Sequence, residues 1–178
     1  NAPGFGGAEN FPTENDDLNM ISIFNWNNFL FISLSDDIEV FNKLDQIDNI
    51  LPEFPYSELC KNPVRNEYIL DCHWALYCDN YLEGFHIPYV HKGINDDMIW
   101  KQYETEIFDE IVLQKATSSN SENSIDYDSE GNIYAYYFFI FPNIMINYYN
   151  WGISINIVEP IAIEKTRVKY IIYNLKGE

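Results

Sequence analysis

Two of the chain's three histidines, His86 and His91, lie five residues apart, with Asn80 and Glu83 just upstream. On a straight α-helix a separation of five residues turns side chains about 140° apart, so the two imidazoles would not converge. Pro88 lies between them, removes a backbone donor and disfavours helical geometry at the residue before it. We therefore expect a break there that lets both rings turn toward one point. Neutral imidazole binds iron, zinc or copper, and two histidines with one carboxylate are the usual ligand set for non-haem Fe(II).

Spacing alone leaves other interpretations open. Histidines close together in sequence are often surface or hydrogen-bonded core residues, Glu83 could be a solvated acid, and Asn80 could be a cap or turn residue. The chain could then be a ligand-binding module in which His86 and His91 are merely structural. A zinc hydrolase is a weaker interpretation, because the His-Glu-x-x-His run is missing and only His73 remains to complete a site.

The four residues stand in the run Asn80-x-x-Glu83-x-x-His86-x-x-x-x-His91, with Trp74 upstream. This run resembles the catalytic domain of the large (alpha) subunit of Rieske non-haem iron oxygenases. The family's upstream Asn-Trp-Lys triplet is altered here to His-Trp-Ala. Residues 2–11 look like the segment after the second cluster motif of a Rieske domain. Residues 141–160 and 166–168 are similar to the central sheet of the choline-monooxygenase-like branch.

The resemblance implies that His86 and His91 bind a mononuclear Fe(II), which reacts with O2 beside a small organic substrate. It implies that Glu83 is a bridging carboxylate toward a Rieske-cluster histidine of a neighbouring alpha subunit, and that Asn80 lies close to the iron. The intact parent would then be a homotrimer that takes electrons from a ferredoxin or reductase.

The sequence holds no Cys-x-His and Cys-x-x-His pair, and residues 173–178 offer no aspartate for the family's third iron ligand. We therefore expect the [2Fe–2S] ligands upstream of Asn1 and the third iron ligand beyond Glu178. The chain alone should be inactive.

The fold expected from the pattern is α+β. Residues 19–26 and 29–34 form a candidate hairpin around residues 25–28. Residues 35–49 read as a connecting segment with a short helix, and the prolines between 52 and 63 as a loop. Residues 72–82 have helical spacing. Strands are expected at 100–108, turned at 109–110, and at 111–117, 133–141, 144–149, 154–158 and 166–174. The tract 118–132 reads as an exposed loop ending in a turn, with breaks at 150–152 and 159–164.

The resemblance makes the sheet a helix-grip, SRPBCC-like catalytic domain over residues 41–178, preceded by the tail of an all-β Rieske domain over residues 1–40. Along residues 143–149, alternation puts Asn147 and Tyr149 on one face and Tyr148 on the other. The pattern does not decide which face meets the cavity.

The composition of the chain excludes several classes of binding partner. The 178 residues carry 10 basic and 28 acidic side chains, a formal net charge of -18. That field repels polyanions, so nucleic acid and anionic membrane surfaces are poor partners, and no stretch reaches the roughly 20 apolar residues of a membrane span. The three cysteines, Cys60, Cys72 and Cys78, are too few and oddly numbered for a disulfide framework and favour reduced thiols in a cytoplasmic protein.

Overall fold

A computed structural model describes residues 3–4, 6–11, 13–33, 43–91, 97–108, 111–127 and 131–176. The chain divides into two compact units, Asn1–Leu44 and Asp45–Glu178. The expected turns at 109–110 and 129–132 and most of the expected segment 35–49 lie wholly or partly outside the described residues. The assignment of the first residues to the tail of a Rieske domain stays a prediction.

The first unit contains a two-stranded hairpin, β1 (Ser22–Trp26) and β2 (Phe29–Ser33). Its two-residue turn consists of Asn27 and Asn28, whose φ angles are +49° and +68°. Asparagine tolerates this left-handed region, and two such residues in succession match the right-handed twist of the flanking strands. The predicted hairpin is confirmed. A short 3-10 turn, η1 (Glu14–Asp16), precedes it.

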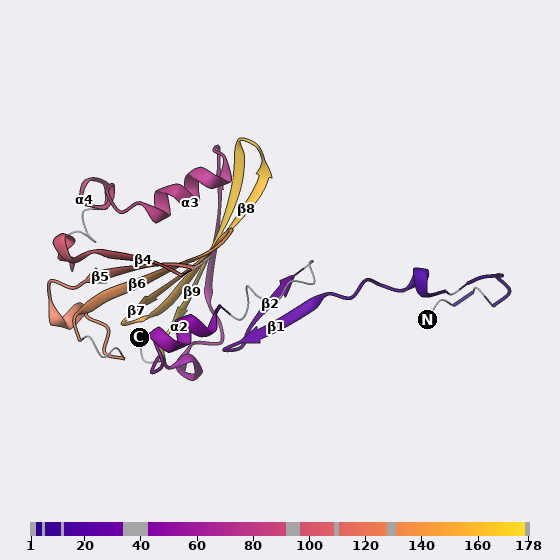
Figure 1. Ribbon diagram of the computed structural model, residues 1–178, viewed down its shortest axis with the longest axis horizontal. Helices are drawn as coiled ribbons and strands as arrows, with labels where there is room; N and C mark the ends of the chain where they lie inside the picture. The colour runs from indigo at the N-terminus through magenta and orange to yellow at the C-terminus, as the bar shows by residue number, and fades with distance from the viewer. Residues whose placement is uncertain are drawn as a thin grey trace. The chain divides into compact units, whose positions relative to one another are not determined.

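The second unit is built on a seven-stranded antiparallel sheet in the order β3-β9-β8-β7-β6-β5-β4 (Figure 1). The strands are β3 (Val64–Leu70), β4 (Glu104–Phe108), β5 (Ile111–Thr117), β6 (Ile133–Ile140), β7 (Ile144–Tyr149), β8 (Gly152–Ala162) and β9 (Lys165–Asn174). Strands β4 to β9 form a meander, as predicted, and β3 joins the far edge beside β9. The α+β class with an antiparallel sheet is confirmed.

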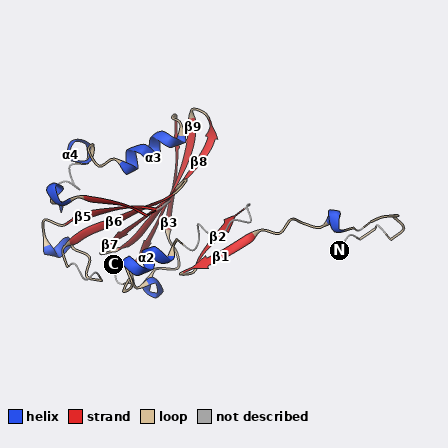
Figure 2. Cartoon of the chain, viewed as in Figure 1, coloured by secondary structure: helices blue, strands red, loops and turns tan. Residues whose placement is uncertain are grey.

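Helices are few and short in this unit (Figure 2). They are α2 (Asp45–Ile50), α3 (Trp74–Leu82) and α4 (Ile87–Val90), with 3-10 turns η2 (Tyr56–Glu58), η3 (Trp100–Gln102) and η4 (Ser121–Asn123). The predicted helix over 72–82 is confirmed as α3. Across the described part of the chain, no helix has the length and apolar character needed to cross a membrane.

One strand was not predicted, and one expected break was wrong. Strand β3 escaped prediction because it is an edge strand that is exposed along almost its whole length and shows no apolar alternation. The break expected at 159–164 is also wrong, since β8 continues through Pro160 to Ala162. A register shift between Pro160 and Ala162 accommodates the proline, which has no N–H to donate to the ladder.

The two faces of the sheet pack against different elements. Helix α3 lies across one face (Figure 1), where Cys78 packs in a buried cluster with Phe139, Met145 and Val158. On the other face the ring of Tyr148 meets Phe54 edge-on at 4.8 Å. This arrangement resolves the phase of β7: Asn147 and Tyr149 lie on the α3 side of the sheet, and Tyr148 points away.

Candidate functional site

The site begins at helix α3. Its N-cap is His73, whose ring nitrogen accepts a hydrogen bond from the Ala75 backbone N–H at 3.3 Å. Capping satisfies one of the four amides that a helix start leaves without partners. The third histidine of the chain is therefore engaged in a structural contact. Helix α3 ends at Leu82, and Glu83 leaves it with extended geometry, φ −99° and ψ 125°.

The break expected between the two candidate ligands is absent, and the chain bends before His86 instead. Pro88 does not interrupt the chain between His86 and His91: it occupies the first turn of α4, with Ile87 as the first helical residue. The expectation of a break at Pro88 was wrong because a missing N–H costs nothing in the first helical turn, where no acceptor is available. The bend that separates α3 from α4 falls at residues 83–86. His86 and His91 flank the single turn of α4 as its two caps.

This arrangement brings the two imidazoles together. The ring centroids of His86 and His91 are 5.1 Å apart, at an interplanar angle of 73°. Oε1 of Glu83 lies 2.6 Å from Nδ1 of His86. Because a carboxylate accepts, a neutral imidazole in this contact has its proton on Nδ1 and its lone pair on Nε2. That tautomer can bind a metal through Nε2.

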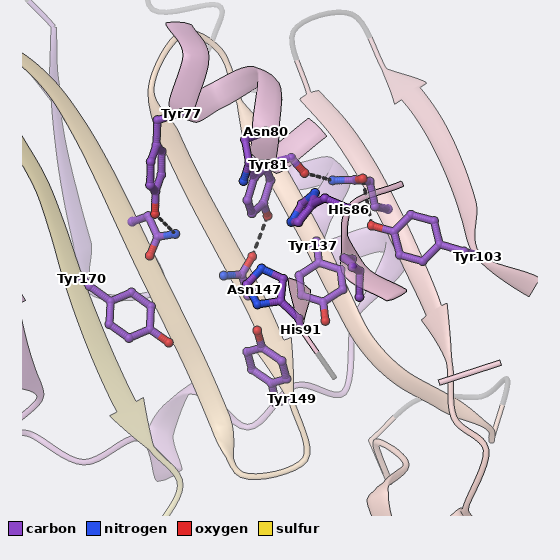
Figure 3. Close-up of a pocket in the computed structure, with 13 residues that line it drawn as sticks. Tyr77, Asn80, Tyr81, His86, His91, Tyr103, Tyr137, Asn147, Tyr149 and Tyr170 are labelled. Carbon is purple, nitrogen blue, oxygen red and sulfur yellow. Dashed lines mark hydrogen bonds between the residues drawn. The ribbon is translucent and has the colours of Figure 1, made fainter. Parts of the chain in front are cut away.

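Both histidines line a cavity of about 400 Å³ between α3, α4 and the sheet (Figure 3). The other lining residues are Tyr77, Asn80, Tyr81, Ile87, Tyr103, Gln114, Tyr137, Asn147, Tyr149, Asn156 and Tyr170. Asn80 thus shares the cavity with the histidines. The carboxylate of Glu83 does not line the cavity; it contacts His86 from behind and is 37% exposed.

The cavity floor is a row of polar side chains paired across strands. Gln114 faces Tyr137, Tyr137 faces Asn147, and Asn147 faces Ser154. The Asn147 amide donates to Ser154 at 3.0 Å and accepts from the Tyr81 hydroxyl at 2.6 Å. Alternation along β7 placed Asn147 and Tyr149 together, and the structure turns that set toward the cavity.

Aromatic and polar side chains line most of the cavity. None of the lining residues named above is Lys, Arg, Asp or Glu. Burial raises the pKa of the Tyr81, Tyr137 and Tyr149 phenols above the ordinary value, so these groups stay neutral at physiological pH. Within the described residues, the buried Oδ1 of Asn156 accepts no hydrogen bond.

The donor set fits two of the three ligands of an iron site. Both imidazoles share one cavity, and His86 has its second nitrogen held by a carboxylate, as metal-binding histidines usually do. Among the described residues, no group of three or more His, Cys, Asp and Glu side chains is arranged to hold a metal ion. The histidines would therefore supply part of a site rather than a closed one.

Comparison with known proteins decides the family. Residues 58–178 match the family described as the ring hydroxylating alpha subunit (catalytic domain). The chain belongs to this family. Choline monooxygenase of Arabidopsis thaliana, a chloroplastic protein, is 36% identical over 117 residues, which are 65% of this chain and 26% of that protein. The corresponding protein of Beta vulgaris is 31% identical over 105 residues, 58% of this chain and 23% of that protein.

Solved structures of the family share the fold. The quaternary ammonium Rieske monooxygenase CntA with inhibitor MMV12 superposes with a TM-score of 0.78 at 19% identity, covering 99% of this chain and 48% of that one. The F352V mutant of naphthalene 1,2-dioxygenase bound to phenanthrene gives 0.60 at 14% identity, covering 88% of this chain and 44% of that one. The chain thus spans about a quarter of the length of these curated relatives and about half of the length of these structures.

Several lining residues were missed from the sequence. Helical spacing put Tyr77 and Tyr81 on one face of α3, but it could not tell a cavity wall from packed core. Gln114 is a sequence signal that was overlooked. It follows three apolar residues in the strand Ile111-Val-Leu-Gln-Lys-Ala, and in the structure its side chain is only 1% exposed. A buried amide inside such a strand needs polar partners, and those partners lie at the site.

Proposed function

We propose that the intact protein is the alpha subunit of an oxygenase that hydroxylates a small organic substrate at a mononuclear Fe(II), with electrons from a Rieske [2Fe–2S] cluster. The observation that carries this proposal is the placement of His86 and His91 on one cavity, with Glu83 on the outer nitrogen of His86. A ligand-binding module would have no need of a carboxylate that fixes one histidine tautomer.

His86 and His91 would hold the iron through one ring nitrogen each, and a carboxylate would complete the set. When bound, the iron supplies the activation of O2. The chain's own residues do the rest: Glu83 fixes the tautomer and orientation of His86, Asn80 faces the cavity beside the histidines, and the tyrosine walls limit the access of water. With two histidines available, the chain alone would bind Fe(II) weakly and remain inactive.

We also propose that Glu83 receives electrons across a subunit boundary, from a cluster histidine of a neighbouring copy. Close to Glu83 in the sequence, three apolar side chains are open to solvent: Phe85 and Tyr89 are each 83% exposed and Val90 is 66% exposed. Exposed apolar side chains of this kind favour contact with a partner surface. The same proposal makes residues 1–40 the tail of a Rieske domain. It also makes the intact protein a homotrimer that takes its electrons from a ferredoxin or a reductase.

For the substrate we propose a small alkylammonium alcohol of the choline type. Six tyrosine rings line the cavity (Tyr77, Tyr81, Tyr103, Tyr137, Tyr149 and Tyr170), and aromatic faces attract ammonium cations. The acidic field of the whole chain raises the local concentration of cations. The unsatisfied Oδ1 of Asn156 would accept a hydrogen bond from a substrate hydroxyl. The similarity of the chain to choline monooxygenases also supports a choline-type substrate.

The test uses the full-length parent, reconstituted with Fe(II) and a reduced cluster and mixed with O2. Choline should trigger O2 uptake and a hydroxylated product in a single turnover, whereas its uncharged isostere 3,3-dimethylbutan-1-ol should give much less. The variants His86→Ala and His91→Ala should abolish turnover. Choline binding that is unaffected by these variants, without any O2 uptake, would instead favour the ligand-binding module. Equal turnover of the isostere would remove the ammonium from the proposal and leave the oxygenase.

A further inference from the structure

A buried amide holds the end of helix α3. Gln114 is 1% exposed, and its Nε2 donates to the backbone carbonyl of Tyr81 at 3.0 Å. The last four carbonyls of a helix have no partner inside the helix. Tyr81 belongs to that last turn, so Gln114 on β5 satisfies one of these carbonyls. The helix end is tied to the sheet two residues before Glu83.

Tyr103 supports this amide from the other side. Its hydroxyl donates to Oε1 of Gln114 at 2.8 Å. Burial raises the pKa of the Tyr103 phenol, and the nearby Glu83 carboxylate raises it further, so the proton stays on the hydroxyl. Gln114 and Tyr103 therefore form an ordered chain of donors that ends at the helix carbonyl. Oε1 of Glu83 is hydrogen-bonded to His86 and is not part of this chain.

The ring of Tyr103 also contacts the residue after Glu83. A Cβ built on Gly84 would lie 3.1 Å from Cε1 of Tyr103 and 3.0 Å from Cη2 of Trp100. The two rings meet each other edge-on at 5.0 Å. Only a residue without a side chain fits this approach without displacing the rings. Glu83 is thus held on both sides, through the Tyr81 carbonyl before it and through the packing of Gly84 after it.

We propose that Tyr103 and Gln114 are positioning residues that fix Glu83 in the geometry that reaches His86. The proposal rests on the proposed function in one respect, that the contact between Glu83 and His86 carries electrons. In this role each residue acts through the end of α3, which sets where the backbone of Glu83 leaves the helix.

The test compares Tyr103→Phe and Gln114→Leu with Tyr148→Phe in the full-length parent. Tyr148 is a matched control, because its buried hydroxyl lies 2.6 Å from that of Tyr56 on the opposite face of the sheet. Two readouts are needed. The first is amide hydrogen exchange at Glu83 and Ile87, whose N–H groups donate to the carbonyls of Asp79 and Gly84. The second is oxidation of the reduced cluster in a single turnover with substrate and O2.

We expect the two positioning variants to speed exchange at Glu83 and Ile87 by about three- to tenfold, the range that loss of one hydrogen bond gives. Cluster oxidation should slow by at least as much, while iron content stays normal. Tyr148→Phe should lower thermal stability without moving either readout. Unchanged exchange in Tyr103→Phe, or the same change in Tyr148→Phe, would overturn the proposal.

A third variant separates this proposal from the electron route. Gln114→Glu keeps an acceptor for Tyr103 but removes the donor to the Tyr81 carbonyl, so exchange should rise as in Gln114→Leu. If exchange rises in these variants while Glu83→Gln oxidises its cluster at the wild-type rate, the positioning role holds and the electron route fails. If exchange does not rise, the positioning role fails whatever Glu83→Gln does.

Discussion

Glu83 caps the end of α3 and His86 caps the start of α4, and their Oε1 and Nδ1 atoms are 2.6 Å from each other. The bend at residues 83–86, which separates α3 from α4, lets this contact form. The carboxylate is 37% exposed and the imidazole 20% exposed. The pair therefore links the inside of the cavity to the surface of the protein within a single hydrogen bond.

Glu83→Gln keeps the shape of this link and removes its charge. Hydrogen bonds to a charged acceptor are about twice as strong as neutral ones, and changes to the partners of metal ligands typically cost about 10- to 100-fold in affinity or activity. We expect single-turnover oxidation of the reduced cluster to fall at least tenfold, with folding, iron content and cluster content near normal. Glu164→Gln, at an exposed turn, is the control, and a wild-type rate in Glu83→Gln would make Glu83 an ordinary surface acid.

The three histidines should respond differently to alanine. His86→Ala and His91→Ala each remove one imidazole from the cavity, so Co(II) bound by the full-length protein should lose stoichiometry and change its visible spectrum. His73→Ala removes the α3 cap instead, which should cost about 0.5–2 kcal/mol of stability and leave the Co(II) spectrum unchanged. Co(II) titration with thermal unfolding of each variant checks this. A spectrum that depends on His73 would contradict the assignment.

Thiol chemistry should separate Cys78 from the other two cysteines. Cys78 is 5% exposed, and burial raises the pKa of its thiol. Because the thiolate is the reactive form, a higher pKa means less of it at any pH below that value. At about pH 8, close to the ordinary thiol pKa, iodoacetamide should label Cys60 and Cys72 first and Cys78 only after unfolding. Peptide mapping by mass spectrometry measures the order, and early labelling of Cys78 would show that α3 detaches readily from the sheet.

An ion-pair network across strands β8 and β9, beside the edge strand β3, should make the free energy of unfolding depend on pH. The hydrogen bond from Lys169 lowers the pKa of the Glu159 carboxyl, and Arg167 at 3.3 Å adds to it. A lowered folded-state pKa gives stability that is complete above the unfolded value and is lost as pH falls through the folded one. Glu159→Gln should cost less than about 1 kcal/mol at pH 7, since the pair is partly exposed. Urea unfolding should show this difference shrink toward pH 3.

The sequence pattern predicted those elements whose structure is determined by residues close together in the chain. The Asn27-Asn28 turn, the span of α3 and the limits of β7 follow from turn residues, helical spacing and alternation. What escaped prediction depends on partners distant in sequence. Strand β3 exists because it pairs with β9, about a hundred residues later. The cavity walls could not be assigned either, since the orientation of β7 depends on which face α3 covers.

The histidine run was the strongest functional signal in the sequence, but the sequence did not predict the geometry of that run. Gly84 and Pro88 were both expected to interrupt the helix, and Pro88 to break the run between the histidines. The bend lies at residues 83–86, where Gly84 packs closely against Trp100 and Tyr103. Contacts of that kind leave no periodic trace in the sequence. The buried Gln114, by contrast, could have been noticed as a polar residue inside an apolar strand.

The order of strands has a consequence for how the protein is made. Strands β3 and β4 are the two edges of the sheet, and the chain between them carries both histidines. The five strands that lie between these edges all come later in the sequence. Tyr81 reaches Asn147 across 66 residues, and Tyr77 reaches Asn156 across 79. Contacts this far apart close slowly. On the ribosome, His86 and His91 would therefore emerge well before β7, β8 and β9 complete the cavity, so we expect metal uptake to follow the last strands rather than guide the first ones.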